Sequence, residues 1–361
     1  MKVLYIYPQF AVKNSGGCVV SKRNFSLLCR YYGDKNVLSY PIHRDNNQSY
    51  LVMFLNDIIS GGWGYTNEDK KKILDIIRSN KIGLVYVDTS LFGGIVRYIK
   101  KKTQVKTIVF FHNVEYTFVK GLVSKQINPL FYYRVLLAYT NEKKAMQYSD
   151  IVISLTRKDS EKLLDTYNRK TDYIIPVTFD NKPIAFSETR DYSEPLHLLF
   201  FGSNFPPNVE AVDILIHKIL PKVNAKLTIA GNGMDKLLTR YTPSEKLTIR
   251  GFVDDIHELY NSSDIVVMPI ISGSGMKVKT AEAMMFGKNI IATDNALEGY
   301  EVDGIPGILR CNSVIDFIES IQNFDRGLPR YNKEARNLFL TRYSDESAAN
   351  IFKCIFDELS Q

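Results

Sequence analysis

The sequence contains few cysteines, and their placement argues against both a disulfide scaffold and a zinc site. No Cys-x-x-Cys pair occurs, and the histidines share no ligand spacing with the cysteines. Scattered cysteines of this kind are typical of reduced core residues in a cytosolic protein. The residues concerned are Cys18, Cys29, Cys311 and Cys354, and His43, His112, His197, His217 and His257.

Long apolar runs are also absent. No window approaches the roughly 18 apolar residues that a membrane-spanning helix needs. The apolar stretch near the N-terminus, Val3–Tyr7, is too short for a signal peptide, and no small-residue cleavage site follows it. We therefore expect a cytoplasmic protein that is soluble or rests on the inner face of a membrane.

A strong excess of one charge is missing as well. The net charge is +7 and the sequence pI is about 8.9. This moderate basic excess is weaker than expected of a dedicated nucleic-acid binder, and it is compatible with anionic phosphates or a membrane surface. We expect no nucleic-acid partner.

The chain is long enough for two domains, and its pattern repeats once. Of its 361 residues, 45% are hydrophobic, whereas single cores stop growing at roughly 250–300 residues. Short β-branched or aromatic runs alternate with helical patterns, which predicts parallel sheets covered on both faces. The predicted strands are Val3–Tyr7, Val37–Tyr40, Leu84–Val87, Thr107–Phe111, Ile151–Leu155, Tyr173–Ile175, His197–Phe201, Lys226–Ala230, Lys246–Arg250, Asp264–Met268, Asn289–Ala292 and Gly307–Leu309.

The predicted fold class is therefore α/β, with two Rossmann-like, doubly wound domains facing each other across a cleft. Helices are predicted at Gly17–Tyr31, Phe131–Tyr148, Asp255–Asn261 and Met276–Phe286, among others. A polar, proline-marked stretch between the halves indicates a linker. We assign residues 1–185 to the first domain, 186–330 to the second and 331–361 to helices that pack back across both. In such folds ligands bind beyond the carboxyl ends of the strands, so the loops after strands are the places to search.

The segment Met268–Lys288 carries the clearest sign of a ligand site. A buried strand ends there, a glycine-rich turn with Gly273 and Gly275 follows, and a helix opens near Met276. Free backbone N–H groups and the helix dipole favour an anion at this point, and Lys277 adds a charge suited to a diphosphate. Alone, the segment is equally compatible with an ordinary glycine turn that caps a helix.

The same helix places a carboxylate behind the turn. At helical spacing Gly275, Lys279 and Glu282 share one face, so Glu282 lies about two turns behind the turn. There it can accept hydrogen bonds from two ribose hydroxyls. The alternative is that this glutamate is merely solvated.

The segment resembles the donor-site signature of family-four retaining glycosyltransferases of the GT-B fold, and Glu282-Ala-Met-Met-Phe-Gly-Lys288 carries that likeness. The resemblance implies that Glu282 holds the nucleotide ribose. It also implies that the backbone of Gly275 and Met276, with Lys277, holds the diphosphate and sugar. In the family a second glutamate stands eight positions earlier, where this chain has Ser274. The sugar contacts must therefore differ, and no sugar preference carries over.

Two further segments of the second half match the same family. Gly202 and Ser203 follow the half's first strand, where the family has a phosphate-facing glycine turn, although Ser203 also suits a simple strand-to-helix turn. The segment Arg250–Tyr260 resembles the loop whose backbone reads the base, and Val253 is our candidate for that contact. Asp254 is expected to be a helix N-cap.

The first half matches the family less closely. Gly16 and Gly17 follow the first strand, where the family has a glycine pair that admits donor phosphate and acceptor. The segment Phe111–Tyr116 resembles the family's His-Asp/Asn-x-Glu motif, whose histidine faces the donor sugar. A lone histidine at a strand end is usually structural, but this motif favours a site role for His112, which we take as the candidate catalytic residue.

The resemblance implies a metal-independent, retaining transfer. No Asp-x-Asp pair, which other glycosyltransferases use to bind a divalent ion, occurs in the chain. We expect no metal and no cofactor, with a nucleoside-diphosphate sugar based on UDP or GDP as the substrate. Lysine and backbone amides would stabilise the leaving phosphate, which itself would help deprotonate the acceptor. His112 would position the donor.

The acceptor is expected to be a glycan or a lipid-linked glycan, in surface polysaccharide or glycoconjugate synthesis. Basic residues of the first half suggest a face resting on an anionic membrane, together with a nearby aromatic and apolar run. The alternative, which the residues favour slightly, is a solvated helix end and an ordinary buried helix face. The two sets are Arg97, Lys100, Lys101, Lys102 and Lys106, and Phe131, Tyr132, Tyr133, Leu136, Leu137 and Tyr139.

Two other functions stay open. The replacement at Ser274 leaves room for a non-catalytic protein that binds a nucleotide sugar. A nucleotide-sugar epimerase of the same fold would need further acid and base groups along the cleft, and His112 alone does not supply them. Turnover with release of free nucleoside diphosphate would separate an enzyme from a binder.

Overall fold

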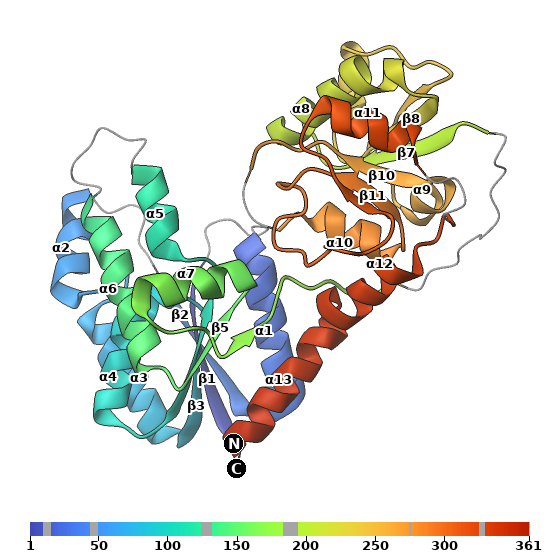
Figure 1. Cartoon of the computed structure of the whole chain (residues 1–361). Helices are drawn as coiled ribbons and strands as arrows, with labels where there is room; N and C mark the ends of the chain where they lie inside the picture. The colour runs from blue at the N-terminus through green and yellow to red at the C-terminus, as the bar shows by residue number, and fades with distance from the viewer. Residues whose placement is uncertain are drawn as a thin grey trace. The chain divides into compact units, whose positions relative to one another are not determined.

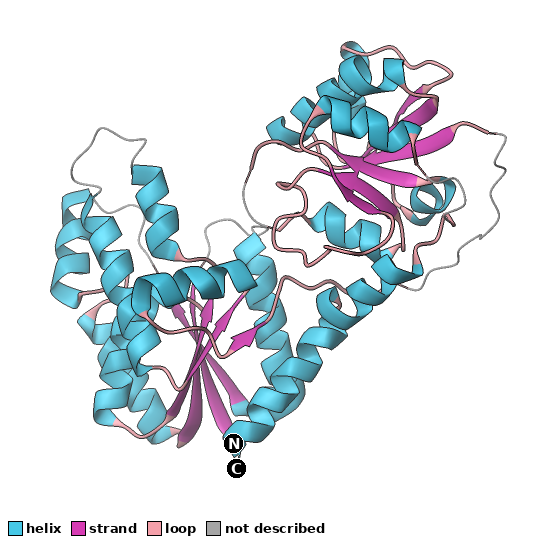
Figure 2. Ribbon diagram, viewed as in Figure 1, coloured by secondary structure: helices cyan, strands magenta, loops and turns pink. Residues whose placement is uncertain are grey.

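The computed structural model describes residues 1–9, 16–43, 50–123, 132–182, 194–273, 276–324 and 329–360. The chain divides into two compact units, the first formed by Met1–Val177 with Ala348–Gln361 and the second by Thr178–Ser347. Each unit contains a sheet flanked by helices (Figures 1 and 2). The units are described one at a time.

The first unit has a six-stranded, parallel sheet in the order β2-β1-β3-β4-β5-β6. Its strands are β1 (Lys2–Pro8), β2 (Val37–Ile42), β3 (Ile82–Val87), β4 (Lys106–Phe111), β5 (Ile151–Ser154) and β6 (Tyr173–Ile174). Its helices are α1 (Gly16–Tyr32), η1 (Asp34–Asn36), α2 (Tyr50–Ser60), α3 (Asn67–Ser79), η2 (Ser90–Phe92), α4 (Gly93–Lys102), α5 (Glu115–Val123), α6 (Tyr132–Tyr148), α7 (Arg157–Tyr167) and most of α13 (Asp345–Ser360).

The alternation of side chains along β1 separates two cores in this unit. Val3 and Tyr5 belong to one buried cluster, and Leu4 and Ile6 belong to another. Successive residues of a strand point to opposite faces of the sheet, so each face has its own apolar layer. The cluster around Val3 includes residues of α13, so the last helix of the chain completes the core of the first unit.

The second unit has a six-stranded, parallel sheet in the order β12-β11-β10-β7-β8-β9. Its strands are β7 (Leu196–Phe201), β8 (Ala225–Ala230), β9 (Leu247–Ile249), β10 (Ile265–Met268), β11 (Asn289–Ala292) and β12 (Ile308–Arg310). Its helices are α8 (Pro206–Ile214), η4 (Leu215–Ile219), η5 (Leu220–Lys222), η6 (Met234–Thr239), α9 (His257–Ser262), α10 (Val278–Met285), α11 (Val314–Gln322), α12 (Lys333–Leu338) and η7 (Phe339–Tyr343).

Each sheet has a point where the strand order reverses. In the first unit this switch lies between β1 and β3, and in the second it lies between β7 and β10. Loops that leave neighbouring strands at such a point diverge to opposite faces and leave a crevice at the carboxyl ends of the strands. The prediction of two doubly wound α/β domains is confirmed, with six strands in each sheet.

The structure places some boundaries differently from the sequence. The first unit ends at Val177, and the tail is shared, because α12 and η7 lie in the second unit and most of α13 in the first. The helix expected from Met276 starts at Val278. The expected N-cap at Asp254 is wrong: the carboxylate that accepts from the N–H of His257, at 2.8 Å, is that of Asp255.

Within the residues that the structure describes, no helix has both the length and the apolar character needed to cross a membrane.

Candidate functional site

The carboxyl edge of the second sheet brings several backbone turns into close contact. Gly202 directly follows β7, and its N–H donates to the carbonyl of Ala230 at the end of β8 (2.9 Å). Gly231 has a φ of +136°, and a Cβ there would lie 2.0 Å from the carbonyl oxygen of Gly202. Only glycine fits such a position, so the two turns can touch because Gly231 carries no side chain.

Lys279 joins the turn after β7 to helix α10. Its ammonium donates to Oδ1 of Asn208 at 2.5 Å and lies 4.6 Å from the centre of the Phe200 ring. A Cβ on Gly202 would come within 2.8 Å of the same nitrogen. Asn208 in turn donates to the carbonyl of Ser203 (2.8 Å). The two loops that flank the switch point are therefore held together by one half-buried cation.

The environment of Lys279 changes its ionisation. Burial lowers the pKa of this ammonium to about 8, although the nearby Glu282 carboxylate opposes the change. The ammonium of Lys279 therefore loses its proton, and with it the positive charge, near pH 8. Lys279 was placed on the face of Glu282 by helical spacing but was not among our candidate site residues. Its half-buried position against another loop is a tertiary feature that spacing does not show.

The turn after β10 is described on both sides of Ser274 and Gly275, which themselves lie outside the described residues. Gly273 has a φ of +99°, and its carbonyl accepts from Nδ2 of Asn295 at 2.8 Å. Met276 is half-buried and packs on the core of the second unit.

Lys277 stands at the N-cap position of α10, and no side chain caps the helix there. Its own side chain is half-buried, and burial lowers the pKa of its ammonium. The Tyr300 hydroxyl donates to its carbonyl at 2.7 Å, which fixes the backbone at the start of the helix. A half-buried cation thus stands at a helix N-terminus, where backbone N–H groups lack intrahelical partners.

The side chain of Glu282 is half-buried in the second unit. Burial raises the pKa of its carboxyl group, and Lys182, Lys279 and the hydroxyl of Tyr260 oppose that rise. Tyr260 is fully buried and stacks on Phe286 with ring centres 4.3 Å apart and an interplanar angle of 7°. A rigid aromatic wall therefore backs the carboxylate that we expect to hold a ribose.

Val253 lies in the loop between β9 and α9. It is half-buried and packs on the core of the second unit. The neighbouring Phe252 is 72% exposed. Because the Val253 side chain packs on the core, the backbone of this loop is held in place, as a contact with a base requires. The contact with the base stays a prediction.

In the first unit, His112 follows β4 and meets a buried carboxylate that follows β3. Its Nε2 lies 3.0 Å from the carbonyl oxygen of Asp88 and 3.3 Å from Oδ2 of the same residue. The Asp88 side chain is completely buried and also accepts from the hydroxyl of Ser21 and from Nδ2 of Asn24. A buried carboxylate with three partners holds the histidine in one orientation.

A second buried carboxylate fixes the segment that carries His112. Glu142 of α6 accepts from the backbone N–H groups of Glu115 (2.7 Å) and Tyr116 (3.1 Å), which open α5, and from the hydroxyl of Tyr167 (2.8 Å). Burial raises the pKa of Glu142 to about 7. It acts as an anionic cap for α5, supplied by another helix.

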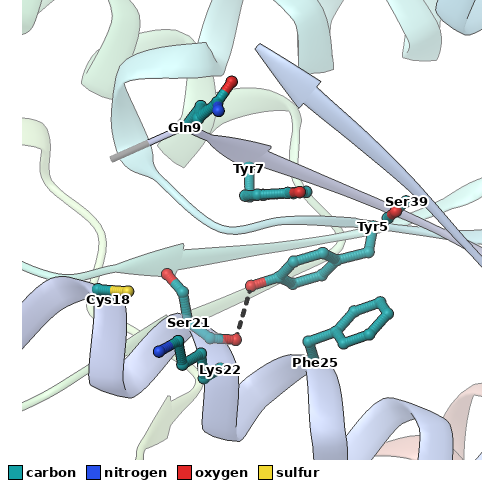
Figure 3. A pocket seen from close by; sticks show the side chains of 8 residues that line it. All are labelled: Tyr5, Tyr7, Gln9, Cys18, Ser21, Lys22, Phe25 and Ser39. Carbon is teal, nitrogen blue, oxygen red and sulfur yellow. Dashed lines mark hydrogen bonds between the residues drawn. The ribbon is translucent and has the colours of Figure 1, made fainter. Parts of the chain in front are cut away.

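Gly16 and Gly17 are the first residues of α1, and residues 10–15 before them lie outside the described residues. Beside this helix the structure has a cavity of about 500 Å³ between β1, β2 and α1 (Figure 3). Its lining consists of Tyr5, Tyr7, Gln9, Cys18, Ser21, Lys22, Phe25 and Ser39.

Aromatic rings form much of this cavity. Tyr5 and Tyr7 stack with centres 5.3 Å apart, and Phe25 lies 5.2 Å from Tyr5. The hydroxyl of Tyr5 donates to the carbonyl of Ser21 (2.9 Å), as Figure 3 shows. We had not identified this cavity from the sequence, because its residues come from three separate elements.

The structure therefore gathers the candidates into two groups. Gly202, Ser203, Lys277 and Glu282 lie near the switch point of the second unit, and Lys279 joins them. His112 lies at the corresponding edge of the first unit. That His112 faces a donor bound by the second unit stays a prediction.

Comparison with known proteins gives the family of the second half and the fold of the chain. Residues 195–324 match the sequence model of the family described as glycosyl transferases group 1. An uncharacterised 44.6 kDa protein of the cps region of Klebsiella pneumoniae is 23% identical over 265 residues, which cover 68% of this chain and 66% of that protein. The match thus spans slightly less than two thirds of that relative.

Two solved structures illustrate the likeness in fold. The lipopolysaccharide outer core galactosyltransferase WaaB in its apo form has a TM-score of 0.67 at 12% identity, covering 99% of this chain and 100% of that one. The Anabaena protein HepE in complex with UDP has a TM-score of 0.62 at 13% identity, with the same coverage. At such identities the likeness shows the fold, which is the GT-B fold.

Asp88→Asn tests the buried network beneath His112. An amide cannot accept from all three groups at once, so the free energy of unfolding of the first unit is expected to fall by about 1–3 kcal/mol. Trp63, the single tryptophan of the chain, lies in this unit, and its fluorescence during urea unfolding is the measurement. Asp165→Asn, an exposed change in the same unit, is the control and should change stability by less than about 0.5 kcal/mol. Equal stability of the two variants would contradict the network.

Proposed function

Because residues 195–324 match the sequence model of the glycosyl transferases group 1 family, we propose that the protein is a glycosyltransferase. It moves a sugar from a nucleoside-diphosphate sugar to a glycan or lipid-linked acceptor, with retention of configuration and without a metal ion. The observation that carries this proposal is the group formed by Lys277, Lys279 and Glu282 at the switch point of the second sheet.

The donor diphosphate binds between the turn after β7 and the start of α10. Two half-buried lysines and the unpaired N–H groups of a helix N-terminus supply positive potential there. Gly202 and Ser203 provide backbone that a phosphate can approach closely, and Ser274 with Gly275 contribute from the other turn. A protein of the same fold binds UDP, and we propose UDP or GDP as the nucleotide of the donor.

Glu282 holds the ribose. Its carboxylate is backed by Tyr260 and faces Lys279, so it is fixed in position and its charge is favoured by a neighbouring cation. Two vicinal hydroxyls of a ribose match the two oxygens of a carboxylate. Val253 lies in the loop whose backbone contacts the base.

Charge stabilisation by these groups replaces a divalent ion in the proposed reaction. The sugar–phosphate bond breaks, negative charge grows on the leaving diphosphate, and Lys277 and Lys279 stabilise it. The leaving phosphate takes the proton of the acceptor hydroxyl, which attacks from the same face, so configuration is retained. His112, held by Asp88, positions the donor sugar.

The acceptor binds to the first unit. The cavity of about 500 Å³ beside α1 combines aromatic faces with hydroxyl groups, a lining suited to sugar rings. The relative from the cps region of Klebsiella pneumoniae supports a role in surface polysaccharide or glycoconjugate synthesis.

A cytoplasmic location with a peripheral contact to an anionic membrane completes the proposal. Side chains of α2 and α6 that are apolar or aromatic stand out from the first unit: Ile59 is 71% exposed, Leu136 63% and Tyr132 59%. Lys101 and Lys102 are exposed at the end of α4. Basic and apolar groups together favour an anionic bilayer surface.

We expect the protein to co-sediment with anionic vesicles at low salt, and absence from the pellet would remove this part of the proposal.

Glu282→Ala tests the ribose contact. Loss of a charged acceptor should weaken the binding of UDP or GDP more than about tenfold, since each hydrogen bond to a charged group contributes roughly 1.5–3 kcal/mol. Calorimetric titration with both nucleotides measures the effect and also identifies the base. Glu319→Ala, an exposed change in the same unit, should leave affinity unaltered. An unchanged affinity in Glu282→Ala would refute the assignment.

The pKa of Lys279 predicts how affinity depends on pH. This pKa is about 8, so the ammonium is mostly charged at pH 7 and mostly neutral at pH 9. Affinity for the nucleoside diphosphate should therefore fall about tenfold between these values. The lowered pKa of Lys277 adds to the same trend.

Lys279→Gln should bind more weakly at pH 7 and lose much of this dependence. Lys236→Gln, an exposed change in the same unit, should keep it. Identical pH profiles for wild type and Lys279→Gln would show that Lys279 does not contact the diphosphate.

A further inference from the structure

The first unit contains a second cavity that the proposed reaction does not use. It has a volume of about 290 Å³ and lies where the end of α2, the helices α3 and α4, and α6 meet (Figure 1). The lining residues are Ser60, Gly61, Lys70, Gly94, Arg97, Tyr98, Lys101 and Lys144. None of them belongs to the donor site, the His112 network or the aromatic cavity.

Four of the eight lining residues are cations, and none is acidic. Arg97 and Tyr98 lie three and four residues after Gly94, and Lys101 lies three residues after Tyr98 and four after Arg97, so α4 presents one continuous face to the cavity. Helices α3 and α6 each contribute one more lysine to the lining. These two lysines are far from α4 in the sequence, so helical spacing does not predict that they lie beside its face. Only the packing of the helices concentrates this charge.

The cations are close enough to affect one another. Burial and the charge of Lys144 lower the pKa of Lys70, and burial and the charge of Arg97 lower the pKa of Lys144. No carboxylate of the described residues forms an ion pair with any of the four. By contrast Lys100, on another side of α4, pairs with Asp150 at 2.9 Å. Unbalanced, partly buried charge of one sign is costly unless an anion compensates it.

The cavity also has donors without acceptors. Nε of Arg97 is buried and has no hydrogen-bond partner. Lys70 donates to the carbonyl of Ser60 (2.7 Å) and to Oδ1 of Asn67 (3.1 Å), so one of its three protons is not used. An oxyanion in the cavity would lie among the ammonium groups and the guanidinium of Arg97, all of which belong to lining residues.

The floor of the cavity is rigid. The Tyr65 hydroxyl donates to Oδ1 of Asn141 (3.0 Å), and the same oxygen accepts from the N–H of Gly94 (3.0 Å). Nδ2 of Asn141 donates to the carbonyl of Gly61 (3.2 Å). A Cβ on Gly94 would lie 1.9 Å from the Tyr65 hydroxyl, so this close approach requires glycine. The cations are therefore arranged around a preformed hollow.

We propose that this cavity binds a phosphate group, held by Arg97, Lys144, Lys70 and Lys101. Four positive charges around a small hollow match a group with two negative charges and several acceptor oxygens. This site is separate from the donor diphosphate site and does not depend on the proposed reaction, although Lys101 also belongs to the proposed membrane contact.

The phosphate can be a soluble ion or the headgroup of a lipid. Ile58 and Ile59, which directly precede the lining residue Ser60, are 51% and 71% exposed. Apolar side chains beside a phosphate site are suited to a headgroup at a bilayer surface. Both sources share one chemistry, so the test has one arm for each.

The test uses the full chain and two double variants of equal charge. Arg97→Gln with Lys144→Gln removes two cations of the cavity, and Lys71→Gln with Lys143→Gln removes two exposed lysines from the same unit. The first arm is equilibrium dialysis against radiolabelled inorganic phosphate. The second is co-sedimentation with phosphatidylcholine vesicles, with and without phosphatidic acid.

The cavity variant should bind phosphate, or the phosphatidic acid vesicles, at least about tenfold more weakly than wild type, while the exposed variant should bind as wild type does. A loss confined to dialysis identifies a soluble phosphate, and a loss confined to vesicles identifies a headgroup. Equal binding by both variants in both arms would overturn the proposal, as would absence of binding by wild type.

Folding and the donor site are controlled separately. Lys144→Glu changes the charge of the cavity by the same two units with a single substitution and should also weaken binding. Trp63 fluorescence during urea unfolding checks that each variant is folded. UDP titration of the cavity variant should give the wild-type affinity. Loss of UDP binding together with phosphate binding would overturn the separate site, whereas failure of UDP to bind wild type would affect only the proposed function.

Discussion

The proposed donor site of the second unit depends on the contact between the ammonium of Lys279 and the turn after β7. The cation lies against Gly202, donates to Asn208 and stands over the ring of Phe200, and its own helix carries Glu282. It therefore connects the two loops that leave the sheet at its switch point. A helix N-terminus alone is a weak anion site, but a helix tied to a second glycine turn by a half-buried charge forms a preorganised one.

Holding charged groups in place before a ligand binds has an electrostatic cost, which appears as shifts in the pKa values of these groups. Lys279 carries a lowered pKa because it is buried, and Glu282 carries a raised pKa for the same reason. Each group partly compensates the other, and a bound diphosphate would compensate the lysine more fully. Groups whose charge is disfavoured in the free protein and favoured by a ligand are typical of binding sites. The cavity with Arg97 and Lys144 shows the same imbalance without any acidic partner.

Much of the fold could be predicted from the sequence. Runs such as Val3–Tyr7 are apolar without interruption because parallel strands are buried on both faces, and this predicted six strands in each half. The turns with Gly202 and Gly273 could also be predicted, because glycines in the loops that follow strands are conspicuous. Helix starts were less accurate. Asp254 and Asp255 are chemically identical, and only the backbone decides that Ile256 stands at the N-cap of α9 and that Asp255 accepts from the N–H of His257.

The sequence by itself determined the two sheets, the turn before α10 and the place of Glu282 behind it, because these follow from periodicities within one segment. Tertiary structure alone decided which distant groups meet. Lys279 reaches Asn208, 71 residues away, and His112 reaches Asp88, 24 residues away, because the order of the strands brings their carboxyl ends side by side. The strand order is fixed by packing of the whole sheet, so no local pattern could show these contacts or the cavity where Lys70, Arg97 and Lys144 converge.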